Sequence, residues 1–411
     1  MKKFFALLLS LAMVLALVAC GQKETTTPDD TKTPDDTTPE VEYKVAMITD
    51  YGDITDQSFN QTTYEACKAF AEDNSIEFSY FKPAGDNTAD RVAMIEKAVD
   101  EGFNVIVMPG YAFGGAIVEA APEFPDVKFI ALDVAAGDLL ETAVAKAGEA
   151  YDYTPENWDL NKYVDMSNVY CAVYQEELCG YMAGYAAVKL GYKNLGFLGG
   201  MSVPAVVRYG YGFVQGVDAA AADLGLTDVK LNYIYGGQFF GDADITAVMD
   251  TWYQGGTEVV FACGGGIYTS AVDAAKKVGA KVIGVDVDQA GVIAKYAGVD
   301  GMTVTSAMKG LYPATYDTLT DVIVNGNWEK YVGKIETLGL VSGTDPEANY
   351  VQIPMGDGTQ WSDSFTQDDY KAMVKDMFDG KITVSNNTSS DVSAADFATV
   401  ITVDDQGSIK G

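Results

Sequence analysis

The sequence predicts an α/β protein with two doubly wound parallel-sheet lobes joined by a hinge. Short apolar segments rich in β-branched residues end at carboxylates or glycines, as buried parallel strands do. Each is followed by a polar turn and an amphipathic stretch, which is the rhythm of βαβ units. The rhythm occurs twice within about 370 residues, a length that suggests two domains. We therefore expect two lobes of similar plan with a ligand-binding cleft between them.

The N-terminal segment is predicted to export and anchor the protein. A basic start precedes an apolar run over residues 4–18, which is too short to span a membrane as a helix. The sequence LVAC then ends at Cys20, as a lipoprotein cleavage site does. We expect a signal peptide over 1–19 and a lipidated Cys20 that holds the protein at the extracellular face of the cell membrane. Residues 20–42 are mostly Thr, Pro, Asp and Glu, which predicts a disordered tether.

The charge and the residue types of the chain exclude several classes of function. The chain carries a net charge of −32 and no histidine, and its only arginines are Arg91 and Arg208. Nucleic-acid binding needs basic patches, so no nucleic-acid partner is expected. Without histidine there is no Ser-His-Asp triad and no His-based zinc site, which leaves metal-free work on a small molecule at a cell surface open. Four further cysteines lack CxxC spacing and are expected to be buried thiols with at most one disulfide: Cys67, Cys171, Cys179 and Cys263.

The first lobe is expected to open with a strand that ends at Asp50, a polar turn, and a helix that begins at Ser58. Further strands are predicted at 77–81, 105–108 and 127–132, and further helices at 86–100 and 113–121. In open α/β sheets, ligands bind outside the carboxyl ends of the strands. The side chains of Asp50, Phe59 and Asn60, and Asp133 at the tip of a later strand, are therefore candidates for ligand contact.

A stretch without periodicity, 143–166, interrupts the pattern and is expected to be an insertion or a surface excursion. The second lobe follows with predicted strands at 169–174, 194–198, 229–235, 259–263 and 281–285, and helices at 177–190, 204–224, 243–254 and 269–278. Its strand tips are rich in glycine or carboxylates, at 199–200, 236–242, 264–266 and 286–289. We expect one lobe to comprise 43–168 and 286–310 and the other 169–285 and 311–411, with the place of the C-terminal region open.

Six motifs carry a resemblance to a known family: TDYGDITDQSFNQ (49–61), ALD (131–133), YQEELCGYMAG (174–184), GFLGG (196–200), GYGFVQG (210–216) and GVDVDQ (284–289). In order and spacing, the chain resembles the basic membrane protein (BMP) family, the PnrA-like purine-nucleoside-binding lipoproteins of ABC transporters. The resemblance implies a type I periplasmic-binding-protein-like fold whose lobes close on the ligand. The same resemblance implies a binding protein that is not an enzyme and needs no cofactor. It also implies an ABC permease and an ATPase subunit as partners, which must supply the energy because the chain has no Walker A motif.

Two kinds of contact follow from this resemblance. Phe59 is similar to the family's aromatic residue that stacks on the base from one lobe, and Phe239 or its neighbour Phe240 resembles the partner from the other. The turn that starts at Gly264 would let the backbone approach the ligand, and Asp50 is a further candidate for ligand contact.

The polar contacts are implied at four positions. Asn60 and Asp133 resemble the pair that hydrogen-bonds the purine edge, and Asp286 and Lys309 resemble the contacts to the ribose hydroxyls. A carboxylate that accepts from two vicinal hydroxyls suits a ribose and repels a phosphate, which favours nucleosides over nucleotides. Which nucleoside is bound stays open.

Other interpretations remain. A sugar-binding protein of the same fold and a ligand-sensing lipoprotein without a transporter both fit the pattern. Asp286 and Asp288 could hold a metal ion in an extracellular nucleoside hydrolase. Phe239 could be a core residue, Asp133 could cap the following segment, and the three glycines from Gly264 could form a phosphate loop, although they lack GxGxxG spacing.

Overall fold

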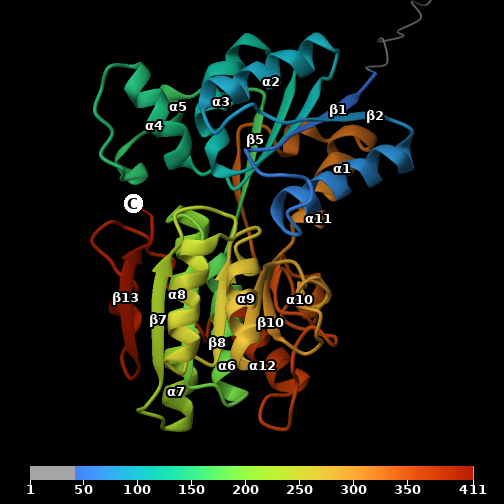
Figure 1. Ribbon diagram of the computed structural model, residues 1–411. Helices are drawn as coiled ribbons and strands as arrows, with labels where there is room; N and C mark the ends of the chain where they lie inside the picture. The colour runs from blue at the N-terminus through green and yellow to red at the C-terminus, as the bar shows by residue number, and fades with distance from the viewer. Residues whose placement is uncertain (1–41, 411) are drawn as a thin grey trace, which may run out of the picture. The chain divides into compact units, whose positions relative to one another are not determined.

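The computed structural model of the protein describes residues 42–410, which are organised around two sheets (Figure 1). The predicted signal peptide, the lipidated Cys20 and nearly all of the tether lie outside the described residues. No helix within residues 42–410 is both long and apolar enough to cross a membrane.

The first sheet has six parallel strands in the order β11-β5-β4-β3-β1-β2. Its strands are β1 (Lys44–Ile48), β2 (Glu77–Phe81), β3 (Val105–Pro109), β4 (Lys128–Leu132), β5 (Val169–Tyr174) and β11 (Ile335–Leu338). The helices that pack around it are α1 (Phe59–Asn74), α2 (Thr88–Asp100), α3 (Gly114–Ala120), α4 (Ala136–Lys146), α5 (Leu160–Tyr163) and α11 (Leu311–Leu319). This sheet and its helices are called lobe 1 below.

The second sheet has seven strands in the order β12-β10-β9-β8-β6-β7-β13, and only the β10–β12 pair is antiparallel among the described strands. Its strands are β6 (Asn194–Gly199), β7 (Lys230–Tyr235), β8 (Val259–Cys263), β9 (Lys281–Asp286), β10 (Thr303–Lys309), β12 (Val351–Gln352) and β13 (Thr402–Ser408). The helices of this half, lobe 2, are α6 (Glu176–Lys189), α7 (Pro204–Leu224), α8 (Ala243–Gln254), α9 (Tyr268–Val278), α10 (Ala290–Ala297) and α12 (Gln367–Phe378).

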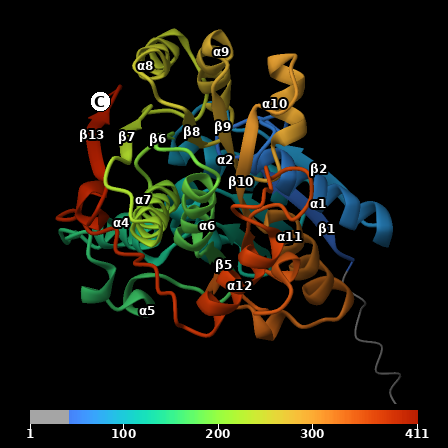
Figure 2. The same cartoon turned by 90° about the horizontal axis from the view of Figure 1, so that it is seen from below.

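The central strands of each sheet are buried on both faces, as their continuous apolar runs predict. In β1, Val45 and Met47 pack into the cluster that contains Phe70 of α1, whereas Ala46 and Ile48 face the helices on the other side. Figure 2 shows the same arrangement for the second sheet, with α6 and α7 on one face and α8 and α9 on the other. The predicted α/β architecture of two doubly wound sheets is therefore confirmed.

The division of the chain between the lobes differs from the expected one. Strand β10, expected in lobe 1 within 286–310, pairs with β9 in the second sheet, and β5, expected in lobe 2, pairs with β4 in the first. From the region 311–411, α11 packs on α1 and β11 joins β5, so the chain crosses between the lobes after β5, after β10 and after β11. A buried strand has the same apolar pattern in either sheet, and only its long-range pairing decides where it lies.

Helices α6 and α7 pack closely, through glycines on both helices. A Cβ atom added to Gly180 would lie 2.3 Å from the carbonyl oxygen of Tyr209, and one added to Gly212 would lie 2.1 Å from that of Glu177. The backbones can therefore touch only because these positions lack a side chain. This contact brings the first turn of α6 beside the first turns of α7, at the edge of the site described below.

The cysteines and the stretch 143–166 lie in different parts of the fold. Cys67, Cys171, Cys179 and Cys263 are all free and buried, as predicted. The stretch 143–166 contains the end of α4, a 3₁₀ turn (Pro155–Asn157) and the short α5, and its Trp158 and tyrosines pack against one another.

Candidate functional site

A cavity of about 410 Å³ lies between the carboxyl ends of the strands of the two sheets. Its volume is in the range of small-molecule binding sites. All eight residues that the sequence suggested as ligand contacts line it: Asp50, Phe59, Asn60, Asp133, Phe239, Gly264, Asp286 and Lys309. The structure thus brings together residues that are up to 259 positions apart in the chain.

The loop after β1 is folded by its own carboxylates. Asp50 Oδ1 accepts hydrogen bonds from the backbone N–H groups of Tyr51 and Gly52, both at 2.6 Å. Asp56 accepts from three N–H groups at the start of α1, those of Ser58, Asn60 and Gln61. Burial raises the pKa of Asp50 and of Asp56, and these hydrogen bonds oppose the shift. Asp50 therefore shapes the cavity wall, as well as lining it.

Asn60 presents one free acceptor. Its side-chain Nδ2 donates to Asp56 Oδ2 at 3.1 Å, and the residue is only 4% exposed. Its Oδ1 has no hydrogen-bond partner among residues 42–410. Because a buried polar atom without a partner is costly, this oxygen is suited to receive a donor from a ligand.

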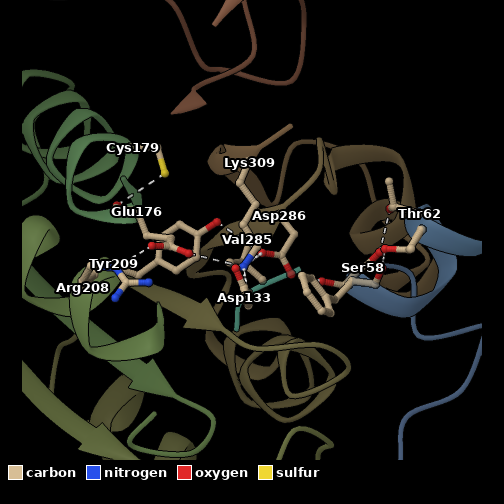
Figure 3. Close-up of polar contacts among 12 residues, drawn as sticks. Ser58, Thr62, Asp133, Glu176, Cys179, Arg208, Tyr209, Val285, Asp286 and Lys309 are labelled. Atoms are coloured by element: carbon tan, nitrogen blue, oxygen red, sulfur yellow. Dashed lines mark hydrogen bonds and ion pairs between the residues drawn. The ribbon is translucent and has the colours of Figure 1, made fainter. Parts of the chain in front are cut away.

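Lys309 is at the centre of the polar half of the site (Figure 3). Its Nζ lies 2.5 Å from Asp133 Oδ2, 3.6 Å from Glu176 Oε1 and 3.7 Å from Asp286 Oδ1. Burial alone would lower the pKa of Lys309, but the three carboxylates more than reverse this and raise it. The amine therefore stays protonated and holds three negative charges that would otherwise repel one another.

The two carboxylates that reach this lysine from the strand ends are held in an uncommon backbone conformation. Asp133, after β4, and Asp286, at the end of β9, have φ values of 59° and 65°, in the left-handed region that non-glycine residues rarely adopt. Asp286 also accepts from Ser58 Oγ at 2.5 Å and from the Tyr209 hydroxyl at 3.2 Å. Asp133 Oδ1, by contrast, has no hydrogen-bond partner within the described part of the chain.

The sequence does not predict the ion pair that lies behind Lys309, between Glu176 and Arg208. Arg208 Nε, on α7, donates to Glu176 Oε2, on α6, at 2.7 Å; the Glu176 side chain is fully buried, and that of Arg208 is 14% exposed. Burial raises the pKa of Glu176, while Arg208 and Lys309 oppose the increase. The close α6–α7 contact brings this pair together, and the spacing of two residues 32 positions apart in the sequence does not reveal it.

The apolar half of the site is aromatic. Lys309 Nζ lies 4.6 Å from the ring centroid of Phe59. On the other side, Phe239 stacks on Tyr51 with ring centroids 6.3 Å apart. Phe240 also lines the cavity, but 59% of its surface is exposed. The choice between the two phenylalanines, which the sequence leaves open, therefore favours Phe239 as the packed wall.

The glycines at the second-lobe strand tips make room for this ring. A Cβ atom added to Gly200 would lie 2.3 Å from Phe239 Cδ1, and one added to Gly264 would lie 2.7 Å from it. Gly264 also has a φ of 144°, which L-residues rarely adopt. The glycine turn therefore seats an aromatic side chain, in addition to lining the cavity.

Three tyrosines that line the cavity were not foreseen. Tyr51 follows Asp50, where the first strand is predicted to end, and Tyr111 lies three residues after the predicted end of the 105–108 strand, so their position in the chain could have identified them. Tyr209 lies inside a long apolar helix, where nothing distinguishes it from a core residue.

Comparison with known proteins places these features in a family. Residues 43–344 match the family described as "ABC transporter substrate-binding protein PnrA-like". A protein of Lactococcus lactis subsp. cremoris, "ABC transporter nucleoside-binding protein BmpA", is 26% identical over 362 residues, which cover 84% of this chain and 90% of that protein. "Basic membrane protein B" of Borreliella burgdorferi is 26% identical over 75% of this chain and 83% of its own length. An uncharacterized lipoprotein of Pyrococcus abyssi is 26% identical over 72% of this chain and 67% of its own length.

Solved structures agree on the fold. A solute-binding protein of an ABC transporter system from Aeropyrum pernix K1 superposes with a TM-score of 0.63 at 18% identity, covering 85% of this chain and 95% of that one. A second, from Conexibacter woesei, has a TM-score of 0.58 at 20% identity, covering 84% of this chain and 99% of that one. Since the family match spans most of the described residues and the fold agrees, the chain belongs to the PnrA-like family of ABC transporter substrate-binding proteins.

Proposed function

We propose that this protein is an extracytoplasmic binding lipoprotein that takes up a purine nucleoside between its lobes and delivers it to an ABC permease. The observation that carries the proposal is the pair of buried acceptors, Asn60 Oδ1 and Asp133 Oδ1, that line the cavity without a partner among residues 42–410. The name of the L. lactis relative, which is called nucleoside-binding, supports the same class of ligand.

The base is proposed to lie against the aromatic side chains. Phe59 and Phe239 offer flat faces from opposite lobes, and stacking of an aromatic ring on a base contributes about 1–3 kcal/mol. The N–H groups on the edge of the purine would donate to Asn60 Oδ1 and Asp133 Oδ1. A ligand without these donors would leave both oxygens unpaired, at a cost of about 1–3 kcal/mol each.

The ribose is proposed to lie over Asp286 and Lys309, where a carboxylate and an amine can bind vicinal hydroxyls. Lys309 also contacts Asp133, so the base end and the ribose end of the site share this amine. Three carboxylates surround the one lysine, and Arg208 offsets only part of the excess negative charge. A phosphate group would meet this negative field, which favours a nucleoside over a nucleotide.

Anchoring and delivery complete the proposal. The lipid on Cys20 would hold the mature chain at the membrane, where hinge closure captures the ligand for the permease and its ATPase. The lipoprotein relatives from Pyrococcus are consistent with such an anchor. The protein would act by binding alone, without a cofactor and without chemistry on the ligand.

Calorimetric titration tests the ligand class. The chain from residue 20, with Cys20→Ser to block lipidation, is unfolded and refolded to remove any carried-over ligand. It is then titrated with adenosine, guanosine, inosine, cytidine, ribose and adenosine monophosphate. Binding of purine nucleosides with much weaker binding of the nucleotide supports the proposal. Binding of ribose or another sugar alone would assign the protein to the sugar binders, and conversion of a bound nucleoside to free base would make it an enzyme.

A further inference from the structure

The C-terminal strand lies beside the loop that carries Phe239. Strand β13 runs parallel to β7 at the edge of the second sheet, from Thr402 opposite Lys230 to Ser408 opposite Tyr235. The carboxyl ends of the two strands therefore meet at one edge (Figure 1). Strand β13 lies beyond residues 43–344, the part of the chain that matches the family. The C-terminal strand therefore ends next to the loop that carries one wall of the cavity.

Three contacts join the residues after β13 to the end of β7 and to the loop that follows it. The backbone N–H of Ile409 donates to the carbonyl oxygen of Tyr235 at 2.8 Å. Lys410 Nζ then donates to Gln238 Oε1 at 2.9 Å and forms an ion pair with Asp242. The lysine therefore contacts both flanks of the two-phenylalanine segment, one residue before Phe239 and two residues after Phe240.

The loop is also closed on itself around these groups. Gln238 Nε2 donates to the carbonyl oxygen of Phe240 and to Asp242 Oδ2, both at 2.9 Å. Asp242 Oδ1 caps α8 by accepting from the N–H of Ile245 at 3.0 Å. Gly237, with a φ of 79°, lies so close to Lys410 that an added Cβ would come within 2.7 Å of it. The lysine is thus packed against the loop, as well as bonded to it.

The opposite side of the loop faces the ligand cavity. The N–H of Gly266 donates to the carbonyl oxygen of Phe239 at 2.9 Å, and the ring is packed against Gly200 and Gly264. The loop is therefore held between the glycine turn on the cavity side and Lys410 on the outer side.

We propose that Lys410 is a positioning residue for ligand binding, which fixes the Gln238–Asp242 loop so that Phe239 forms a rigid wall of the cavity. This rests on the proposed function, in which Phe239 stacks on the ligand. A pre-ordered loop has less conformational entropy to lose when the ligand binds. The C-terminal strand would thus raise the affinity of a site that it does not touch.

Hydrogen–deuterium exchange of the ligand-free protein tests whether Lys410 orders the Gln238–Asp242 loop. In the ligand-free chain, Lys410→Ala should make peptides covering residues 236–246 exchange several-fold faster, while peptides from β1 and α1 stay unchanged. The matched control is Lys381→Ala, which removes an amine that pairs with Asp376 at 2.6 Å in the same C-terminal region, away from the cavity. Unchanged exchange over 236–246 in Lys410→Ala would overturn the proposal.

Binding tests the consequence. Lys410→Ala should raise the dissociation constant for the tightest purine nucleoside up to about fivefold, the range of a partly exposed ion pair, whereas Lys381→Ala should leave it unchanged. The difference in dissociation constant between the wild type and Lys410→Ala should shrink in 1 M salt, where the screening length falls to about 3 Å. In a Phe239→Ala background, Lys410→Ala should cause no further loss.

Failure of the positioning role can be told apart from failure of the proposed function. Equal affinity of wild type and Lys410→Ala, or an undiminished loss in the Phe239→Ala background, would contradict the positioning role. If the wild type binds no nucleoside, the proposed function fails, and exchange over 236–246 alone decides whether Lys410 orders the loop.

Discussion

Lys309 Nζ, at the end of β10 in lobe 2, lies 2.5 Å from Asp133 Oδ2, which follows β4 in lobe 1. This ion pair joins the two lobes at the candidate ligand site. A hydrogen bond from Ser58 Oγ of lobe 1 to Asp286 Oδ2 of lobe 2, at 2.5 Å, is a second contact between the lobes. The residues proposed to bind the ligand therefore also hold the lobes together, so ligand affinity and protein stability should respond to the same substitutions.

Replacing Lys309 by methionine should destabilise the protein by about 3–5 kcal/mol, because it leaves buried carboxylates without their cation. Nucleoside binding should be lost as well. Urea unfolding and calorimetric titration measure the two effects. The control is Lys277→Met, which removes an amine that pairs with Asp250 at the surface and should cost about 1 kcal/mol or less. Similar losses for the two variants would show that the buried cluster is not held by Lys309.

Glu177 should make stability depend on pH. Burial raises its pKa to about 7 from the usual 4.5, and the neighbouring Glu176 adds to the shift. A carboxyl with a raised pKa binds its proton more tightly in the folded state. It therefore contributes stability below about pH 4.5, and this contribution is lost as the pH rises through 7.

The variant Glu177→Gln stays neutral at every pH and should escape this loss. Relative to the wild type, its free energy of unfolding should be higher at pH 8 by up to about 3 kcal/mol, from ~1.4 kcal/mol per pKa unit, and nearly equal at pH 4. Urea unfolding at the two pH values measures the difference. A constant difference across this range would show that Glu177 does not titrate there.

The contact between α6 and α7 should not tolerate a methyl group. Gly212→Ala would place a carbon 2.1 Å from the carbonyl oxygen of Glu177 and force the helices apart, at a cost of about 1–3 kcal/mol. Because the same contact holds Glu176 beside Arg208, ligand affinity should fall too. Gly291→Ala on α10 is the control: it meets nothing within 4 Å and should stabilise the protein by about 0.5–1 kcal/mol. Thermal unfolding distinguishes them, and equal melting temperatures would refute the close-packing argument.

The two adjacent phenylalanines should contribute unequally. Phe239→Ala should weaken nucleoside binding by about 1–3 kcal/mol, the contribution of one aromatic ring stacked on a base. Phe240→Ala should have a much smaller effect, since that side chain is largely exposed. Titration of both variants with the same nucleoside measures this, and the reverse ranking would transfer the stacking role to Phe240.

The local features of this fold could be predicted from the sequence, and the long-range ones could not. Asp50, Asp133 and Asp286 were identified because they end or follow apolar strands whose carboxyl ends converge in an open sheet. The resemblance to a known family supplied the roles of Phe59 and Lys309. Both signals depend on short stretches of sequence.

Contacts between residues far apart in the chain could not be predicted from such short stretches. The strand that ends at Lys309 joins the second sheet because of its partner β9, and the pairing of Arg208 with Glu176 depends on two helices meeting at glycines. The role of the C-terminal strand was equally hidden, since β13 has the polar, exposed sequence of an edge strand, and its neighbour β7 lies about 170 residues earlier.

A crystal structure of the protein with a bound purine nucleoside would show whether the ligand occupies the proposed site. We expect the base to lie against Phe59 and Phe239, with N–H donors of its edge about 2.7–3.2 Å from Asn60 Oδ1 and Asp133 Oδ1. A nucleoside bound elsewhere, or in this cavity with both oxygens still unpaired, would contradict it.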